Sequence, residues 1–250
     1  CVGEGRRRRR MGIRASVTTG ASEKMGVVSP LILPDVAVLD PELTLGLPAH
    51  VTAATGIDAM VHAIEAYASA NPNNNPVSRA LAVEALRLMG RVLQRAVDTP
   101  GNIEARSDMM LGSMLAGQAF ANSPVAAVHA LAYPIGGHYK VPHGLSNALV
   151  LPHVLRFNAE AAPLAYAELL PHVFPQVSDT GVGDAAVKFV EVMAALRRDC
   201  GVQQNLRDVG IEKEALPMLA CDAMNQTRLL VNNPRPVDEA AALAIYEAAW

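Results

Sequence analysis

The sequence predicts a mainly α-helical fold, a helical bundle preceded by a short extended or β segment. Residues 27–45 are rich in Val and Leu and contain three prolines that would break a helix. From Pro48 onward the chain consists of Ala-rich segments with helical periodicity, and no strands alternate with them. The chain divides accordingly into an atypical N-terminal tail over residues 1–22, an extended segment over 23–47, and an all-helical domain over 48–250.

The composition favours a globular protein over a binder of nucleic acids or membrane surfaces. Of the 250 residues, 51% are apolar and 18% are charged, which is typical of a globular protein with a sizeable core. Twenty-one basic residues balance 24 acidic ones, so the sequence does not favour a nucleic-acid or membrane-surface binder. The exception is Arg6–Arg10, five consecutive arginines; a nuclear-import signal or an artefactual terminus before Met11 would each explain them.

The cysteines and the hydropathy pattern predict a cytoplasmic protein. The three cysteines form no Cys-x-x-Cys pattern, which favours reduced thiols over a disulfide framework or a thiolate zinc site. No run of about 18 apolar residues is long enough to span a bilayer. The arginine run is not followed by the apolar region of a secretory signal.

The helical elements are predicted in order along the chain. Pro48 suits the first turn of a helix that extends to about Ser69. In 78–97, charged residues recur on one face and apolar residues on another, and 103–121 is a Met- and Leu-rich helix that we expect to be buried. In 184–199 the amphipathic pattern returns.

Two helix ends are marked by single residues. Gly201 is a good C-terminal cap for the 184–199 helix, since glycine readily adopts the left-handed conformation found there. Asp238 caps a last helix that runs to Trp250.

Asp58 and His62 are the first candidate ligands. They stand four residues apart, so on a helix their side chains share one face and can hold one metal ion. A surface Asp–His pair without a metal is the alternative.

His129 and His143 are the second pair of candidates. His129 sits in an apolar helix, which we expect Pro134 and the Gly136-Gly137 pair to end. His143 opens the next apolar run, so the two imidazoles can converge from two helices. For either residue, a core histidine bonded to a carbonyl is the alternative.

Taken together, these residues offer one carboxylate and three imidazoles. Such a set suits Fe²⁺ or Zn²⁺ with a coordination position left for an oxygen ligand. The set does not name a reaction, because it can bind an alcohol or activate a water. A metal-dependent hydrolase would need a general base, and Glu65 is the nearby carboxylate.

Several longer motifs resemble the iron-containing alcohol dehydrogenase family. The likeness runs from about residue 20 to the C-terminus. The motifs are Lys24-Met25-Gly26-Val27-Val28-Ser29-Pro30, Thr55-Gly56-Ile57-Asp58-Ala59-Met60-Val61-His62-Ala63-Ile64-Glu65-Ala66-Tyr67, His129-Ala130-Leu131-Ala132-Tyr133-Pro134-Ile135-Gly136-Gly137, Pro142-His143-Gly144-Leu145-Ser146-Asn147-Ala148 and Arg228-Leu229-Leu230-Val231-Asn232-Asn233-Pro234-Arg235.

The resemblance implies a fold, a ligand set and cofactors. The fold would be the helical C-terminal domain seen in dehydroquinate synthase-like proteins, with 23–47 a remnant of the interdomain region. The ligands of Fe²⁺ or Zn²⁺ would be Asp58, His62, His129 and His143, and full-length members also bind NAD(P). The Gly-Gly-Gly-Ser phosphate loop of that cofactor site is absent from this sequence, so we expect this chain to represent the metal-binding half of the enzyme.

Two further residues are candidate catalytic residues by the same resemblance. Tyr133 stands where many members carry a His, at the place of the proton relay or nicotinamide contact. His138 is an additional His that would face the substrate or lie behind the ligands, with a plain surface position as the alternative.

The implied function is hydride transfer between a small alcohol or aldehyde and NAD(P), in a homodimer. The alternatives are a non-catalytic metal-binding or scaffold module of the same fold and a maleylacetate reductase-type member.

Overall fold

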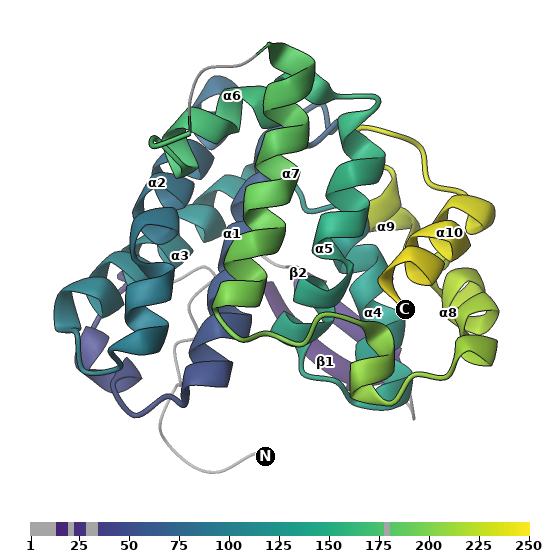
Figure 1. Cartoon of the computed structure of the whole chain (residues 1–250), viewed down its shortest axis with the longest axis horizontal. Helices are drawn as coiled ribbons and strands as arrows, with labels where there is room; N and C mark the ends of the chain where they lie inside the picture. The colour runs from purple at the N-terminus through teal and green to yellow at the C-terminus, as the bar shows by residue number, and fades with distance from the viewer. Residues whose placement is uncertain (1–13, 20–22, 29–34, 178–180) are drawn as a thin grey trace.

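The computed structural model describes residues 14–19, 23–28, 35–177 and 181–250. Over these residues the chain is a helical bundle preceded by a short β-hairpin, which confirms the predicted fold class (Figure 1). Arg6–Arg10 lie outside the described residues. The α-helices are α1 (Ala49–Ala68), α2 (Pro76–Asp98), α3 (Ile103–Asn122), α4 (Ala127–Tyr139), α5 (His143–Ala159), α6 (Pro163–Val173), α7 (Val182–Asp199), α8 (Leu216–Ala223), α9 (Thr227–Leu230) and α10 (Glu239–Ala249).

The N-terminal hairpin corrects the sequence analysis at one point. Strand β1 (Arg14–Thr19) pairs antiparallel with β2 (Glu23–Val28), although residues 14–19 had been assigned to the tail, with no element expected there. The expected extended segment also contains a short 3₁₀-helix, η2 (Pro41–Thr44), because the carboxylate of Asp40 accepts a hydrogen bond from the Glu42 N–H.

Helix α1 is the central element of the bundle. It packs against α2, α3, α5 and α6, and Ile57, Met60 and Ile64 of α1 are fully buried in the main core. In Figure 1, α1 passes behind α7, with α2 and α3 on one side and α4 and α5 on the other. Side chains on α1 can therefore reach α4 and α5 inside the bundle.

The surface helices end and turn largely as their sequences predict. In α2 the apolar residues Ala85, Leu88 and Val92 are buried, whereas Arg91 and Arg95 are exposed. Asp238 caps α10 through the Ala241 N–H, as expected. Gly201 adopts the left-handed conformation (φ 73°) two residues after the end of α7, as expected for the residue that follows a helix C-cap.

Helix α3 differs from its prediction. It forms where expected, but its buried residues are mostly small, and Leu111 is 38% exposed. The reason is close packing against α2: a Cβ built at Gly112 would lie 2.5 Å from Met89 Cγ and 3.1 Å from the Ala85 carbonyl oxygen. The small face of α3 therefore turns inward, and the Met- and Leu-rich face lies nearer the surface.

Helix α4 also differs from its prediction. Pro134 and the Gly136-Gly137 pair do not end it; the helix continues to Tyr139 and ends at Lys140, whose φ is 57°. All three of those residues are buried, so packing of the helix in the core outweighs the hydrogen bond that proline removes.

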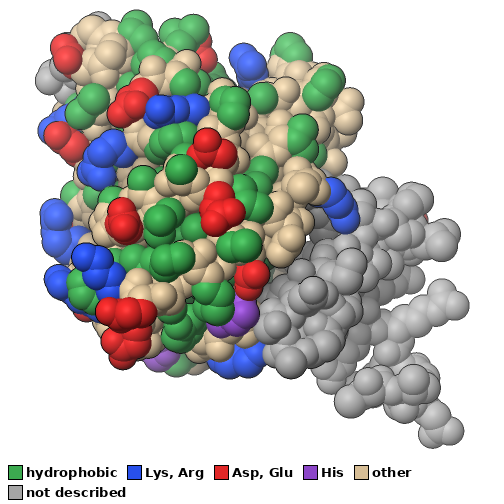
Figure 2. Space-filling model, turned by 90° about the vertical axis from the view of Figure 1, so that its right-hand side faces the viewer, with side chains coloured by type: hydrophobic (Ala, Val, Ile, Leu, Met, Phe, Trp, Pro, Cys, Tyr) green, Lys and Arg blue, Asp and Glu red, His purple; other side chains and the backbone are tan. Residues whose placement is uncertain are grey.

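The described surface carries charges of both signs. On the face in Figure 2, acidic, basic and apolar side chains are interspersed, and no large basic patch is visible there. None of the helices in the described part of the chain has the length and hydropathy needed to cross a membrane.

Candidate metal centre

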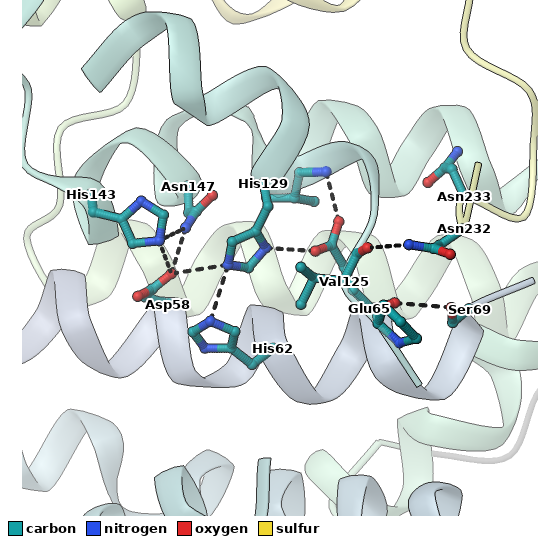
Figure 3. Close-up of polar contacts among 12 residues, drawn as sticks. Asp58, His62, Glu65, Ser69, Val125, His129, His143, Asn147, Asn232 and Asn233 are labelled. Carbon is teal, nitrogen blue, oxygen red and sulfur yellow. Dashed lines mark hydrogen bonds and ion pairs between the residues drawn. The ribbon is translucent and has the colours of Figure 1, made fainter. Parts of the chain in front are cut away.

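The site is built on one face of α1. Asp58, His62 and Glu65 follow one another at spacings of four and three residues, so they line the same side of this helix. The side chain of Asp58 is 15% exposed and Glu65 is 6% exposed. Figure 3 shows all three directed toward α4 and α5.

Helix α4 contributes His129, which is only 2% exposed. Its Nε2 lies 3.1 Å from His62 Nε2 and 3.8 Å from Asp58 Oδ1. Its other ring nitrogen, Nδ1, lies 2.6 Å from Glu65 Oε2. His129 therefore faces two candidate ligands with one nitrogen and a buried carboxylate with the other (Figure 3).

Helix α5 contributes His143 and Asn147 at its first turns. His143 Nε2 lies 3.8 Å from Asp58 Oδ1, and the amide of Asn147 donates to Asp58 Oδ1 at 2.5 Å. Gly144 allows this approach, because a Cβ there would lie 2.7 Å from the Ala54 carbonyl oxygen of α1.

The donor atoms fit a single divalent cation. Ligand atoms at about 2.1 Å from a tetrahedral ion lie about 3.4 Å from one another, and the separations of 3.1 to 3.8 Å between the donor atoms here bracket that value. Among the described residues, Asp58, His62 and His129 form a set whose ligand atoms all lie within 4.8 Å of one another. His143 lies at the edge of this set, next to Asp58. One carboxylate with several imidazoles is a donor set that suits Fe²⁺ or Zn²⁺.

The carboxyl of Asp58 is stabilised in its charged form. Burial opposes that charge, but the neighbouring His62, His143 and His129 and the amide of Asn147 together outweigh it. The net effect is to lower the pKa of Asp58 below its ordinary value. An ionised carboxylate is the form that binds a cation.

Aromatic rings surround the imidazoles. Phe120 of α3 stacks on His62 with ring centroids 4.6 Å apart. Tyr133, one helical turn after His129, has its ring centroid 6.0 Å from that of His143. Tyr133 therefore borders the cluster.

His138 lies outside the cluster. Its Nε2 is 2.5 Å from Asp222 Oδ2 of α8, and neither group is buried. His138 and His129 are nine positions apart on α4, which places them on opposite faces of that helix. The geometry therefore favours the surface alternative for His138.

Two residues in the site were not assigned as site residues from the sequence. Asn147 appeared only inside a longer motif, yet it is fully buried and bonds Asp58. Its spacing of four residues from His143 was the available signal. Glu65 was considered only as a hydrolytic base, whereas both of its oxygens are engaged by α4.

Comparisons with known proteins identify the family of this chain. Residues 52–250 match the model of the Fe-containing alcohol dehydrogenase family, C-terminal region. The chain is 43% identical to long-chain-alcohol dehydrogenase 1 of Geobacillus thermodenitrificans over 94% of its own length and 59% of that protein. It is 40% identical to 1,3-propanediol dehydrogenase of Klebsiella pneumoniae, over 93% of this chain and 59% of the relative.

A solved structure supports the same relationship. The alcohol dehydrogenase from Oenococcus oeni superposes with a TM-score of 0.90 at 33% identity, over 96% of this chain and 62% of that one. The chain thus spans about three fifths of the length of these relatives. It belongs to the Fe-containing alcohol dehydrogenase family, and the region it matches is the family's C-terminal one.

Proposed function

We propose that this chain supplies the metal-binding site of an alcohol dehydrogenase that uses NAD(P), together with the site that receives the oxygen of the substrate. The observation that carries this proposal is the convergence of Asp58, His62 and His129 within 4.8 Å, with His143 beside Asp58. These four residues would hold Fe²⁺ or Zn²⁺. A divalent cation bound there would supply Lewis acidity toward the oxygen of an alcohol or aldehyde.

The surrounding residues have separate roles in this proposal. Asn147 orients the carboxylate of Asp58 through its amide. The ring of Phe120, stacked on His62, limits the access of water to that imidazole. The hydroxyl of Tyr133, on the helix that carries His129, is the proposed group for proton exchange with the substrate oxygen.

The substrate class is proposed from the relatives' names. Those names specify long-chain alcohols and 1,3-propanediol, and 1,3-propanediol carries two primary hydroxyl groups. We therefore expect a primary alcohol or the matching aldehyde as substrate. NAD(P) binding and a homodimer are proposed from the same family membership. A cytoplasmic location is proposed from the cysteine and hydropathy patterns.

The geometry argues against a hydrolase. Glu65 was the candidate general base, but its two oxygens accept from the Val128 N–H and contact His129 Nδ1, each at 2.6 Å. A carboxylate so occupied, and 6% exposed, is poorly placed to take a proton from a water in the open site.

Metal loading combined with NAD⁺ reduction tests the proposal. The chain is joined to the nucleotide-binding region of a full-length family member and loaded anaerobically with Fe²⁺ or aerobically with Zn²⁺. The bound metal is counted, and NADH is followed with 1-propanol and 1,3-propanediol. We expect one metal per chain, and we expect turnover to require it. His129→Ala should abolish both, whereas the control His172→Ala, an exposed residue of α6, should change neither.

Two results would contradict the proposal. If the chain binds no divalent metal at near-stoichiometric concentration, the ligand assignment fails. If the chain joined to that nucleotide-binding region binds one metal but gives no NADH with any primary alcohol, the result supports the non-catalytic metal-binding alternative.

A further inference from the structure

Glu65 is a buried carboxylate that none of the roles above uses. It lies on α1 one turn beyond His62 and is 6% exposed. Burying a carboxylate is costly unless its oxygens are paired. In this structure both oxygens contact α4, one at the Val128 N–H and the other at the ring of His129.

One oxygen of Glu65 serves the start of α4. The Val128 N–H donates to Oε1 at 2.6 Å. The residue that precedes the helix, Ala126, provides no side-chain cap, and the first four N–H groups of any α-helix lack partners within the helix. Glu65 thus stabilises the end of α4 that carries His129.

The other oxygen of Glu65 determines which ring nitrogen of His129 bears the hydrogen. Oε2 lies 2.6 Å from His129 Nδ1, and a carboxylate can only accept a hydrogen bond. Nδ1 must therefore carry the hydrogen. In neutral imidazole this leaves Nε2 with its lone pair, directed at His62 Nε2 and Asp58 Oδ1 (Figure 3).

We infer that Glu65 is a positioning residue that holds His129 in the Nδ1–H tautomer. The Nε2 atom, which faces the cation site, then carries a lone pair and no hydrogen. The part that concerns the cation rests on the proposed function, but the tautomer is a property of the chain itself. Outer partners of this kind typically change metal affinity by about 10- to 100-fold when removed.

Glu65→Gln is a sharp test because the Val128 N–H fixes the orientation of the new amide. The amide oxygen must face that donor, so the NH₂ group faces His129 Nδ1. His129 then accepts at Nδ1 and carries its hydrogen on Nε2, where it would block a metal. The helix cap is retained, so the thermal midpoint of the metal-free protein should change little.

Two measurements compare Glu65→Gln with the wild type. Long-range ¹H–¹⁵N correlation spectra of the metal-free chain identify the tautomer of His129, and a competition titration with Zn²⁺ gives the affinity. We expect Nδ1–H in the wild type, Nε2–H in Glu65→Gln, and an affinity about 10- to 100-fold lower in the variant.

Ser123→Ala provides the matched control. Ser123 Oγ donates to the Ala66 carbonyl at 2.6 Å and so holds the loop before α4 to the same part of α1, without contact to His129 in the described hydrogen bonds. Its loss should lower the thermal midpoint while leaving the tautomer and the affinity unchanged.

The outcomes separate this inference from the proposed function. An Nε2–H tautomer of His129 in the wild type, or wild-type Zn²⁺ affinity in Glu65→Gln, overturns the role of Glu65. The tautomer measurement on the wild type does not depend on whether any variant folds. A wild type that shows Nδ1–H but binds no Zn²⁺ supports the role of Glu65 and overturns the metal site instead.

Discussion

Single residues of the candidate site differ in how firmly the fold holds them. The side chain of His129 is 3% exposed and is fixed by Glu65, and its Nε2 belongs to the set of mutually close ligand atoms. His143 stands at the first position of α5, and its side chain is 38% exposed. The two histidines should therefore contribute unequally to metal binding.

Replacing each histidine by alanine tests this difference. His129→Ala removes a buried donor at the centre of the set. We expect metal affinity to fall by more than about 100-fold, the upper end of the effect seen when a residue that only supports a ligand is removed. His143→Ala should also lose most of its bound metal when the protein is at micromolar concentration. Its remaining affinity for the metal should nevertheless be higher than that of His129→Ala. Elemental analysis after dialysis measures both. Equal metal content in His143→Ala and the wild type would remove His143 from the ligand set.

His153 of α5 is a titratable residue outside the site. Burial and the charges of Arg197 and Arg156 lower its pKa to about 4. The ordinary value in an unfolded chain is about 6.5. Between these pH values the unfolded state takes up a proton that the folded state resists, so folding stability falls as the pH drops from about 6.5 to about 4.

His153→Leu should remove this part of the pH dependence. A shift of this size corresponds to at most about 3 kcal/mol of unfolding free energy. We expect urea unfolding of the variant to lose less stability than the wild type between pH 6.5 and pH 4. His172→Leu makes the same substitution at an exposed histidine and should follow the wild-type curve. Parallel curves for His153→Leu and the wild type would show that His153 does not contribute.

At the scale of elements, periodicity and capping residues predicted where most helices lie. The Asp238 cap and the Gly201 turn were visible because each depends on one residue type in one local conformation. The burial of α3 and the length of α4 were not predictable in this way. Both depend on what lies across the helix, such as Met89 against Gly112.

The contact between α1 and α5 is the element-scale feature on which the site depends. Gly144→Ala would place a Cβ 2.7 Å from the backbone oxygen of Ala54, so α5 must move away from α1. We expect a loss of about 1–3 kcal/mol of unfolding free energy. We also expect weaker metal binding, because His143 and Asn147 move with α5.

Gly117→Ala is the matched control for this prediction. A Cβ at Gly117, within α3, would meet no atom within 4 Å, so the substitution should be neutral or stabilise the helix by up to about 1 kcal/mol. Thermal unfolding and Zn²⁺ titration measure both variants. Unchanged affinity in Gly144→Ala would show that the α1–α5 distance does not control the site.

At the scale of the whole molecule, the candidate site is the point where α1, α4 and α5 meet. The sequence identified Asp58 and His62 as a pair because they share one helix, and His129 and His143 as a second pair on two neighbouring helices. The family resemblance then joined the four into one ligand set. Neither source gave the roles of Glu65 and Asn147, because a buried partner is recognised only once the helices are in place. The mutual arrangement of the three helices is what the structure adds.

A cation that joins three helices should stabilise the whole bundle. Binding to the folded state alone adds about 2.7 kcal/mol when the free metal is 100 times its dissociation constant. We therefore expect the thermal midpoint to rise with Zn²⁺ in a concentration-dependent way and to return when a chelator is added. Asp58→Asn should show a much smaller rise. A midpoint that does not respond to metal would contradict a site between the helices.

X-ray absorption spectroscopy of the Zn²⁺-loaded chain tests the central claim most directly. Our account predicts one bound ion with nitrogen and oxygen donors at about 2.0–2.2 Å, together with the multiple scattering of two or three imidazoles. That imidazole signal should weaken in His129→Ala. A spectrum with sulfur donors, or one with oxygen donors only, would contradict the site formed by Asp58, His62, His129 and His143.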